Sequence, residues 1–82
     1  MSGLRPLPAQ APRACRVEVD GDGRPCAVDG RAVEAVREEW RVEEGWWAKP
    51  VRRRCFALVL AGGRLAEVHE DRRTGRWWRH GR

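Results

Sequence analysis

The sequence has no tyrosine, one phenylalanine and one lysine, and it contains no long apolar run. Without such a run, no segment is expected to cross a membrane as a helix. Residues 1–14, MSGLRPLPAQAPRA, lack the apolar core of a secretory signal peptide. The three cysteines, Cys15, Cys26 and Cys55, are odd in number and include no close pair, which is unlike a disulfide framework. We therefore expect a cytoplasmic protein without a membrane partner, whose cysteines are small core residues.

The chain of 82 residues is long enough for one domain. Residues 1–13 carry three of the five prolines among small residues, a composition typical of a disordered tail. Residues 14–82 are then expected to form a single small domain. A domain of this size buries only about 60% of the surface that its unfolded chain exposes, so the five tryptophans are needed for its core.

The first half of this domain has the pattern of short strands joined by tight turns. Residues 15–19 alternate apolar and polar side chains, and the glycines of residues 21–23 indicate a turn into a short strand over residues 25–28. Asp29-Gly30 is a favoured two-residue hairpin turn, because both residues tolerate a positive φ.

Residues 31–44, RAVEAVREEWRVEE, fit two structures. Val33, Val36 and Trp40 have the spacing of one helix face, so a helical turn is one alternative. As a strand, the segment would place Val36, Trp40 and Val42 on one face and the charged residues between them on the other. We favour the strand, bulged near Ala35, because the Asp-Gly turn leads directly into it.

The second half continues the same pattern around one very apolar segment. Residues 45–50 are a connection, and residues 54–61, RCFALVLA, are expected to be the central strand with both faces covered. Gly62-Gly63 turns the chain into a strand over 65–69, and residues 71–75 form the next turn before a last strand over 76–79. The sequence therefore predicts an all-β fold, a strongly curved antiparallel meander or half-open barrel of five to six strands.

Charge is unevenly divided along the chain. Residues 1–48 contain seven arginines against nine acids, whereas residues 49–82 contain nine arginines and a lysine against three acids. The basic half is expected either to face an anionic partner or to pair with the acidic half. The acidic cluster Glu38, Glu39, Glu43 and Glu44 decides between these alternatives, since pairing across the sheet would partly neutralise the arginines.

A series of landmarks resembles a small bacterial domain family of unknown function, over residues 15–80. The shared features are, in order, V-D-G-R at 28–31, V-x-x-V at 33–36, Trp40, Gly45-Trp46-Trp47, an arginine pair, an apolar strand, a Gly-Arg hairpin, Asp71 and Gly75-Arg76-Trp77. A similar module lies at the C-terminus of the inactive, Y-family polymerase-like subunit of the bacterial mutasome. The resemblance implies a role in DNA repair or error-prone synthesis, through DNA or through a polymerase subunit, and it transfers no catalytic residue.

Two tryptophan pairs, Trp46-Trp47 and Trp77-Trp78, lie close to runs of arginine. Neighbours on an extended chain point to opposite sides, so one indole of each pair is expected in the core and the other outside. An outer indole could stack a base while nearby guanidinium groups contact phosphate, as in proteins that bind single strands. The predicted nucleic-acid-binding residues are Arg52, Arg53, Arg54, Arg72, Arg73, Arg76, Arg79, Trp47 and Trp78. The alternative is structural, with an indole covering a barrel end and the arginines forming a solvated face.

Other chemistry has little support in the sequence. Cys15, Cys26, Cys55, His69 and His80 do not have the spacing of a structural zinc site, so no metal or other cofactor is expected. No nucleophile elbow, phosphate-binding loop or metal-binding His-Glu motif is present, and no small-molecule substrate is evident. An enzyme would require a pocket around His69 and Glu67. The leading hypothesis is a non-enzymatic module that binds nucleic acid, single-stranded DNA in particular; the alternative is a module that recruits a polymerase or mutasome subunit.

Overall fold

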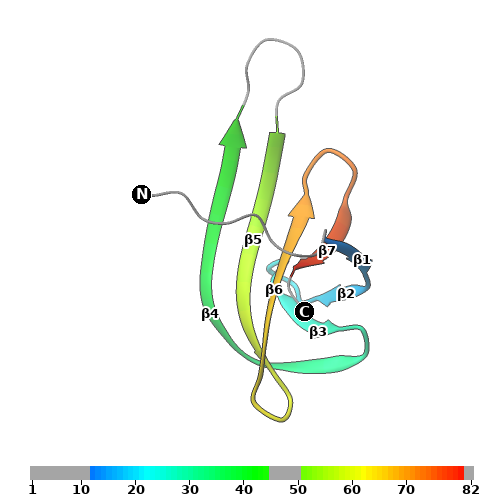
Figure 1. The fold of residues 1–82 in the computed structure, drawn as a ribbon, viewed down its shortest axis with the longest axis vertical. Helices are drawn as coiled ribbons and strands as arrows, with labels where there is room; N and C mark the ends of the chain where they lie inside the picture. Colours follow the sequence, from blue (N-terminus) through cyan, green and yellow to red (C-terminus); the bar gives the residue numbers. More distant parts are fainter. Residues whose placement is uncertain (1–11, 45–50, 81–82) are drawn as a thin grey trace.

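The structure, a computed structural model, describes residues 12–44 and 51–80. This part of the chain is all-β and antiparallel, as the sequence predicts (Figure 1). The strands are β1 (Arg13–Cys15), β2 (Val17–Val19), β3 (Pro25–Val28), β4 (Arg31–Glu44), β5 (Val51–Leu60), β6 (Arg64–Asp71) and β7 (Arg76–His80). No helix in the described residues is long and apolar enough to cross a membrane.

The seven strands form one sheet that curls into a nearly closed barrel. Their order is β1-β7-β6-β5-β4-β3-β2, so consecutive strands from β2 to β7 are neighbours, as expected for a meander. The strands at the two ends of this order, β1 and β2, are separated in sequence by Arg16 alone. The chain on either side of Arg16 therefore pairs first with β7 and then with β3, which brings the two edges of the sheet together.

The strand count of five to six is too low for this reason. Residues 15–19 were expected to form one strand, but the structure has two short strands on either side of Arg16. Arg16 is held by two hydrogen bonds to the β3–β4 turn: its N–H donates to Asp29 Oδ1 at 3.0 Å, and its carbonyl accepts from Asp29 N–H at 2.7 Å. This turn has the positive φ values predicted from its sequence, 50° at Asp29 and 84° at Gly30.

Residues 31–44 form a strand along their whole length, and the helical alternative is wrong. The bulge expected near Ala35 is present, between Val33 and Ala35, and a second irregularity lies between Val36 and Glu38. Because of this second irregularity, the prediction that Val36 and Trp40 share one face of the strand is wrong. Val36 pairs with Leu58 and Trp40 pairs with Cys55, so the extra residue places these two side chains on opposite faces of the sheet.

The core lies on the concave face of β5, the middle strand of the sheet. Phe56, Leu58 and Leu60 alternate along β5 and are buried together with Val28 and Val68. Burying each of these side chains contributes about 1.5–3 kcal/mol, which makes this face the main source of stability. Both faces of β5 were expected to be covered, and Cys55 on the opposite face is also buried. The cysteines are otherwise divided: Cys15 is half-buried against the core, but Cys26 is exposed, contrary to expectation.

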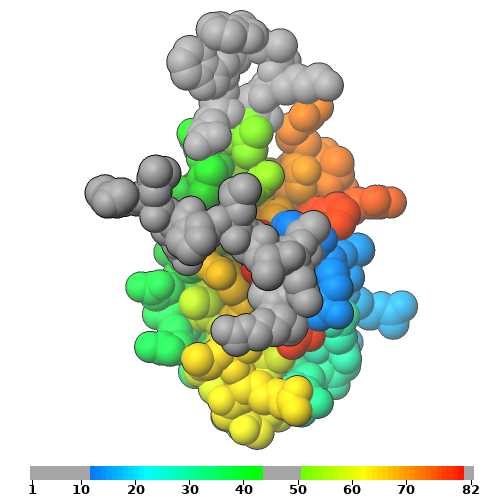
Figure 2. Space-filling model, in the orientation of Figure 1, coloured from blue at the N-terminus to red at the C-terminus, as the bar shows by residue number. Residues whose placement is uncertain are grey.

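Figure 2 shows the β5–β6 turn, which contains Gly62 and Gly63, at one end of the molecule (yellow). The C-terminal end of β4, the N-terminal end of β5 and the β6–β7 turn lie toward the other end (Figure 1). Most of the predicted site residues belong to these last elements. The fold therefore brings residues 52–54 and 72–76 to the same end of the barrel.

Candidate functional site

Register and alternation divide the basic residues of β5 between the two faces of the sheet. Phe56 defines the concave face, so Arg54 and Arg52 lie on that face, while Arg53 lies on the convex face. On the neighbouring strand, Arg41 lies directly opposite Arg54, and Glu43 lies directly opposite Arg52. Directly opposed residues share a face, so β4 adds a further arginine and an acid to the concave side.

These residues line a cavity of about 280 Å³, which we call the arginine cavity. Its lining consists of five arginines and one glutamate: Arg41, Arg52, Arg53, Arg54, Arg72 and Glu43. Four of the predicted site residues thus line one cavity, with Arg52 and Arg54 on the concave face of β5 and Arg53 on its convex face. The fifth arginine, Arg41, was missed because its segment is mainly acidic, and only the β4–β5 register places it opposite Arg54.

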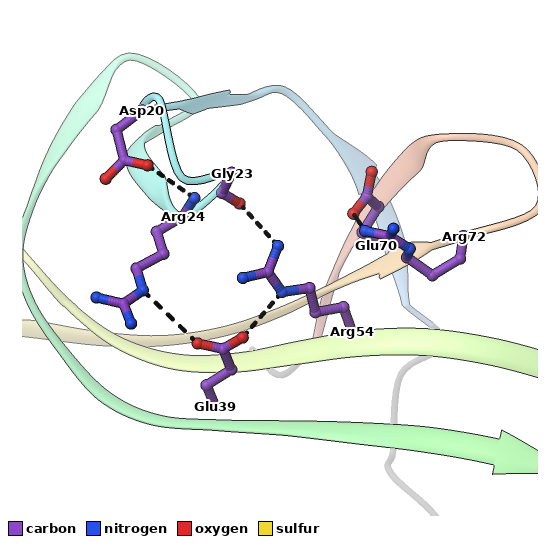
Figure 3. Close-up of polar contacts among 7 residues, drawn as sticks. All are labelled: Asp20, Gly23, Arg24, Glu39, Arg54, Glu70 and Arg72. Carbon is purple, nitrogen blue, oxygen red and sulfur yellow. Dashed lines mark hydrogen bonds and ion pairs between the residues drawn. The ribbon is translucent and has the colours of Figure 1, made fainter.

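Arg54 is the most tightly held member of the arginine cavity (Figure 3). Its Nε donates to Glu39 Oε2 at 2.9 Å, and its Nη1 donates to the carbonyl of Gly23 at 3.3 Å. Its guanidinium carbon also lies 5.1 Å from the ring centre of Phe56. The other oxygen of Glu39 lies 3.8 Å from Arg24 Nε. These contacts join the β2–β3 turn to β4 and β5, so Arg54 serves mainly to hold the cavity wall in place.

Arg72 comes from the β6–β7 turn and is brought to the cavity by its backbone. Its N–H donates to the carbonyl of Arg52 at 2.9 Å, and its guanidinium forms an ion pair with Glu70 at 3.2 Å. The same turn is stabilised by Asp71, whose side chain accepts a hydrogen bond from Arg73 N–H at 2.9 Å. A backbone hydrogen bond therefore holds the arginine of this turn next to the arginine run of β5.

The other predicted arginines lie outside the arginine cavity. Arg73 is exposed on the β6–β7 turn. Arg76 is aligned with Asp71, which is aligned in turn with Arg53, so these three share the convex face. Arg79 forms an ion pair with Asp29 at 3.1 Å, near the point where the barrel closes. The predicted basic set is thus split among the cavity, the convex face and a structural contact.

The second tryptophan pair lies on opposite faces of the sheet, as alternation predicts, but both indoles are half-buried. Trp77 packs against the core, with its ring centre 5.9 Å from that of Phe56. Trp78 lies on the convex face and is half-buried. It belongs to a row across four neighbouring strands, which we call the convex row: Trp40, Cys55, His69 and Trp78. Trp47, with the rest of the first pair, lies outside the described residues.

His69 is a buried histidine that packs against a second one. It is 5% exposed, and its Nδ1 is within hydrogen-bonding contact of His80 Nε2. Burial, followed by the charges of His80 and Arg53, lowers the pKa of His69 to about 4, against a smaller opposite effect of Asp71. His69 is therefore neutral near pH 7. In the described part of the chain, no group of three or more His, Cys, Asp or Glu side chains is placed to hold a metal ion.

A second cavity, of about 420 Å³, bears on the catalytic alternative. Its lining includes Glu67 and His80, which lie directly opposite each other on β6 and β7. His69, the expected second member of a catalytic pocket, is not part of this lining. The remaining walls include the apolar side chains of Leu58, Leu65 and Ala66.

The acidic cluster has a mixed arrangement. Glu39 forms ion pairs with Arg54 and Arg24. Part of the positive charge is therefore neutralised within the protein, as expected if the basic half pairs with the acidic half. Glu43 lies opposite Arg52 and lines the arginine cavity. Glu38 lies opposite Ala57 on the convex face, away from the cavity. The acids therefore neutralise part of the cavity: among its lining arginines, Arg54 and Arg72 have ion-pair partners in the described residues, whereas Arg41 and Arg52 do not.

Comparisons of the chain with protein-family models, with curated proteins and with solved structures found no match.

Proposed function

We propose that the protein is a non-enzymatic module that binds single-stranded nucleic acid, with DNA as the expected form, through the arginine cavity. The observation that carries the proposal is the meeting of five arginines from β4, β5 and the β6–β7 turn around one cavity. Guanidinium groups form paired, charge-assisted hydrogen bonds with phosphate oxygens, and phosphate contacts supply most of the affinity of sequence-independent binding.

The convex face supplies a place for bases in this proposal. Trp78 lies in the convex row, and Arg53 and Arg76 lie in the next row toward the same end of the sheet, on either side of Asp71. An indole next to guanidinium groups is the combination used to stack bases while holding the backbone. The resemblance to the mutasome module suggests that the role belongs to DNA repair or error-prone synthesis.

The test is the affinity for a fluorescent single-stranded oligonucleotide, measured by anisotropy at low salt. Arg41→Ala and Arg52→Ala should each weaken binding more than Arg64→Ala. The control removes the same charge from an exposed arginine at the start of β6, beside the turn at the opposite end of the molecule (Figure 2). Equal losses in all three variants would reject the arginine cavity as the binding site, and absence of binding by the unaltered protein would reject the function.

A second candidate function is recruitment of a protein, such as a polymerase or mutasome subunit, along the edge of β4. Within the described residues, β4 pairs with β3 only at Arg31 and Ala32, whereas its pairing with β5 extends from Val33 to Glu44. The edge of β4 that faces away from β5 therefore has unpaired backbone groups over most of its length, and such edges accept a strand from a partner.

This candidate predicts that the protein retains a partner after nuclease treatment. Replacing a residue of β4 with proline, Glu34→Pro for example, should abolish that retention, because proline removes a backbone donor and distorts the edge. Arg41→Ala should only slow association, since charge acts mainly on the encounter rate. Loss of the partner on nuclease treatment would favour the nucleic-acid function instead.

A further inference from the structure

We propose that the arginine cavity takes the terminal phosphate of a nucleic-acid strand, a phosphomonoester, in preference to an internal phosphodiester. The inference rests on the proposed function and adds the class of group that the cavity selects. It follows from the arginines of the cavity that have no ion-pair partner and from the contacts that hold the two neighbouring turns beside the cavity.

The charge of the cavity matches that of a terminal phosphate. Within the described residues, Arg54 and Arg72 have ion-pair partners, whereas Arg41 and Arg52 have none. Both of the latter line the cavity, and Glu43 is its single acidic lining residue. A phosphomonoester carries about −1.5 to −2 charges at pH 7 and three acceptor oxygens, whereas an internal phosphodiester carries about −1. Two guanidinium groups without ion-pair partners are therefore better matched by the monoester.

The walls of the cavity favour the end of a strand. On the concave side, the contacts of Arg54 with Glu39 and with the Gly23 carbonyl tie the β2–β3 turn across the sheet (Figure 3). On another side, the hydrogen bond from Arg72 N–H to the Arg52 carbonyl holds the β6–β7 turn against β5. The lining of the cavity contains none of the buried core residues, so a ligand held between these two ties stays at the end of the barrel. The end of a strand needs an exit for the chain on one side only, so a cavity flanked by two such ties suits a terminal phosphate better than an internal one.

The size of the cavity agrees with this choice. Its volume of about 280 Å³ is smaller than that of the second cavity, about 420 Å³, and it lies just below the range of about 300–1,000 Å³ typical of sites for whole small molecules. The space suits a phosphate with part of its sugar. A base would remain outside, free to contact the neighbouring surface.

The experiment compares three single-stranded oligonucleotides of one sequence, with a 5′-phosphate, with a 3′-phosphate or with hydroxyl groups at both ends. Anisotropy would give their affinities for the full chain at one salt concentration, with an internal fluorophore. We expect one of the phosphorylated strands to bind about tenfold more tightly than the hydroxyl strand, because charge-assisted hydrogen bonds to the terminal oxygens are gained. Inorganic phosphate should compete with the phosphorylated strand at lower concentrations than chloride does.

The preference should depend on the unpaired arginines. Arg52→Gln and Arg41→Gln are each expected to reduce the preference for the phosphorylated strand to about twofold or less. Arg64→Gln should leave this preference unchanged, because Arg64 is the first residue of β6 and lies outside the cavity. Circular dichroism of each variant checks that the variant is folded. The affinities of the three oligonucleotides for the unaltered protein test the inference without any variant.

Two results would overturn the inference, and they differ from the failure of the proposed function. Equal affinity for all three strands would show that the cavity does not select the terminal group, while binding to nucleic acid would stand. A preference that survives both Arg41→Gln and Arg52→Gln would place the selectivity elsewhere. If none of the strands binds at low salt, the proposed function itself fails.

Discussion

The ion pair between Glu39 and Arg54 is expected to be a stabilising contact rather than a surface pairing. The two side chains are 28% and 16% exposed, and their charged atoms are 2.9 Å apart. Hydrogen bonds to charged groups contribute about 1.5–3 kcal/mol when buried, and exposed ion pairs about 0.2–1 kcal/mol. The intermediate exposure predicts a coupling free energy of about 1–2 kcal/mol.

The neighbouring pair provides an internal comparison. Arg24 also faces Glu39, but its separation is 3.8 Å and its side chain is 58% exposed, so its coupling should be below about 0.5 kcal/mol. Two double-mutant cycles, with Glu39→Ala, Arg54→Ala and Arg24→Ala, would measure both values by urea unfolding followed by tryptophan fluorescence. Equal couplings for the two pairs, or a negligible value for Glu39 with Arg54, would refute the assignment of Arg54 to the cavity wall.

Three further predictions concern other parts of the barrel. Because the pKa of His69 is lowered from 6.5 to about 4, the unfolded chain binds a proton that the folded protein excludes, and the free energy of unfolding should fall as the pH drops through this interval. His69→Gln should flatten that slope in urea unfolding at stepped pH, and an unchanged slope would contradict the assignment. Asp29→Ala should destabilise the protein by about 1–2 kcal/mol more than Asp29→Asn, because asparagine tolerates the φ of 50° and keeps an acceptor for Arg16 N–H. Equal thermal midpoints of the two variants would contradict this role of Asp29. Trp78→Ala should weaken oligonucleotide binding by about 1–3 kcal/mol with little loss of stability, whereas Trp77→Ala should lower the unfolding midpoint; the reverse pattern would exchange their roles.

Local patterns were enough to predict most of the fold. The Asp29-Gly30 turn, the Gly62-Gly63 turn and the apolar run of β5 each determine their own conformation, and successive hairpins then define a meander. The break at Arg16 could not be predicted in this way. It depends on the side chain of Asp29 meeting the backbone of a segment 13 residues earlier, a contact that only the closed barrel creates.

The sequence was enough to predict which residue types form the candidate site, but not which of them lie together. The runs at 52–54 and 72–73 identify the basic elements, but the face of each residue depends on strand register. The second irregularity in β4 separates Val36 from the face of Trp40, and the resulting register places Arg41 opposite Arg54. The local sequence also gives no sign that Arg79 is paired with Asp29, a residue 50 positions away.

The most direct test of the account is the salt dependence of single-stranded DNA binding. If the arginine cavity contacts phosphate, a plot of log affinity against log salt should be linear, with a slope of about −0.7 for each phosphate contacted. Arg52→Ala should make the slope shallower by about one such contact, and Arg64→Ala should not. A slope near zero for the unaltered protein, or an Arg52→Ala slope equal to it, would contradict the claim that these guanidinium groups bind the backbone of a nucleic acid.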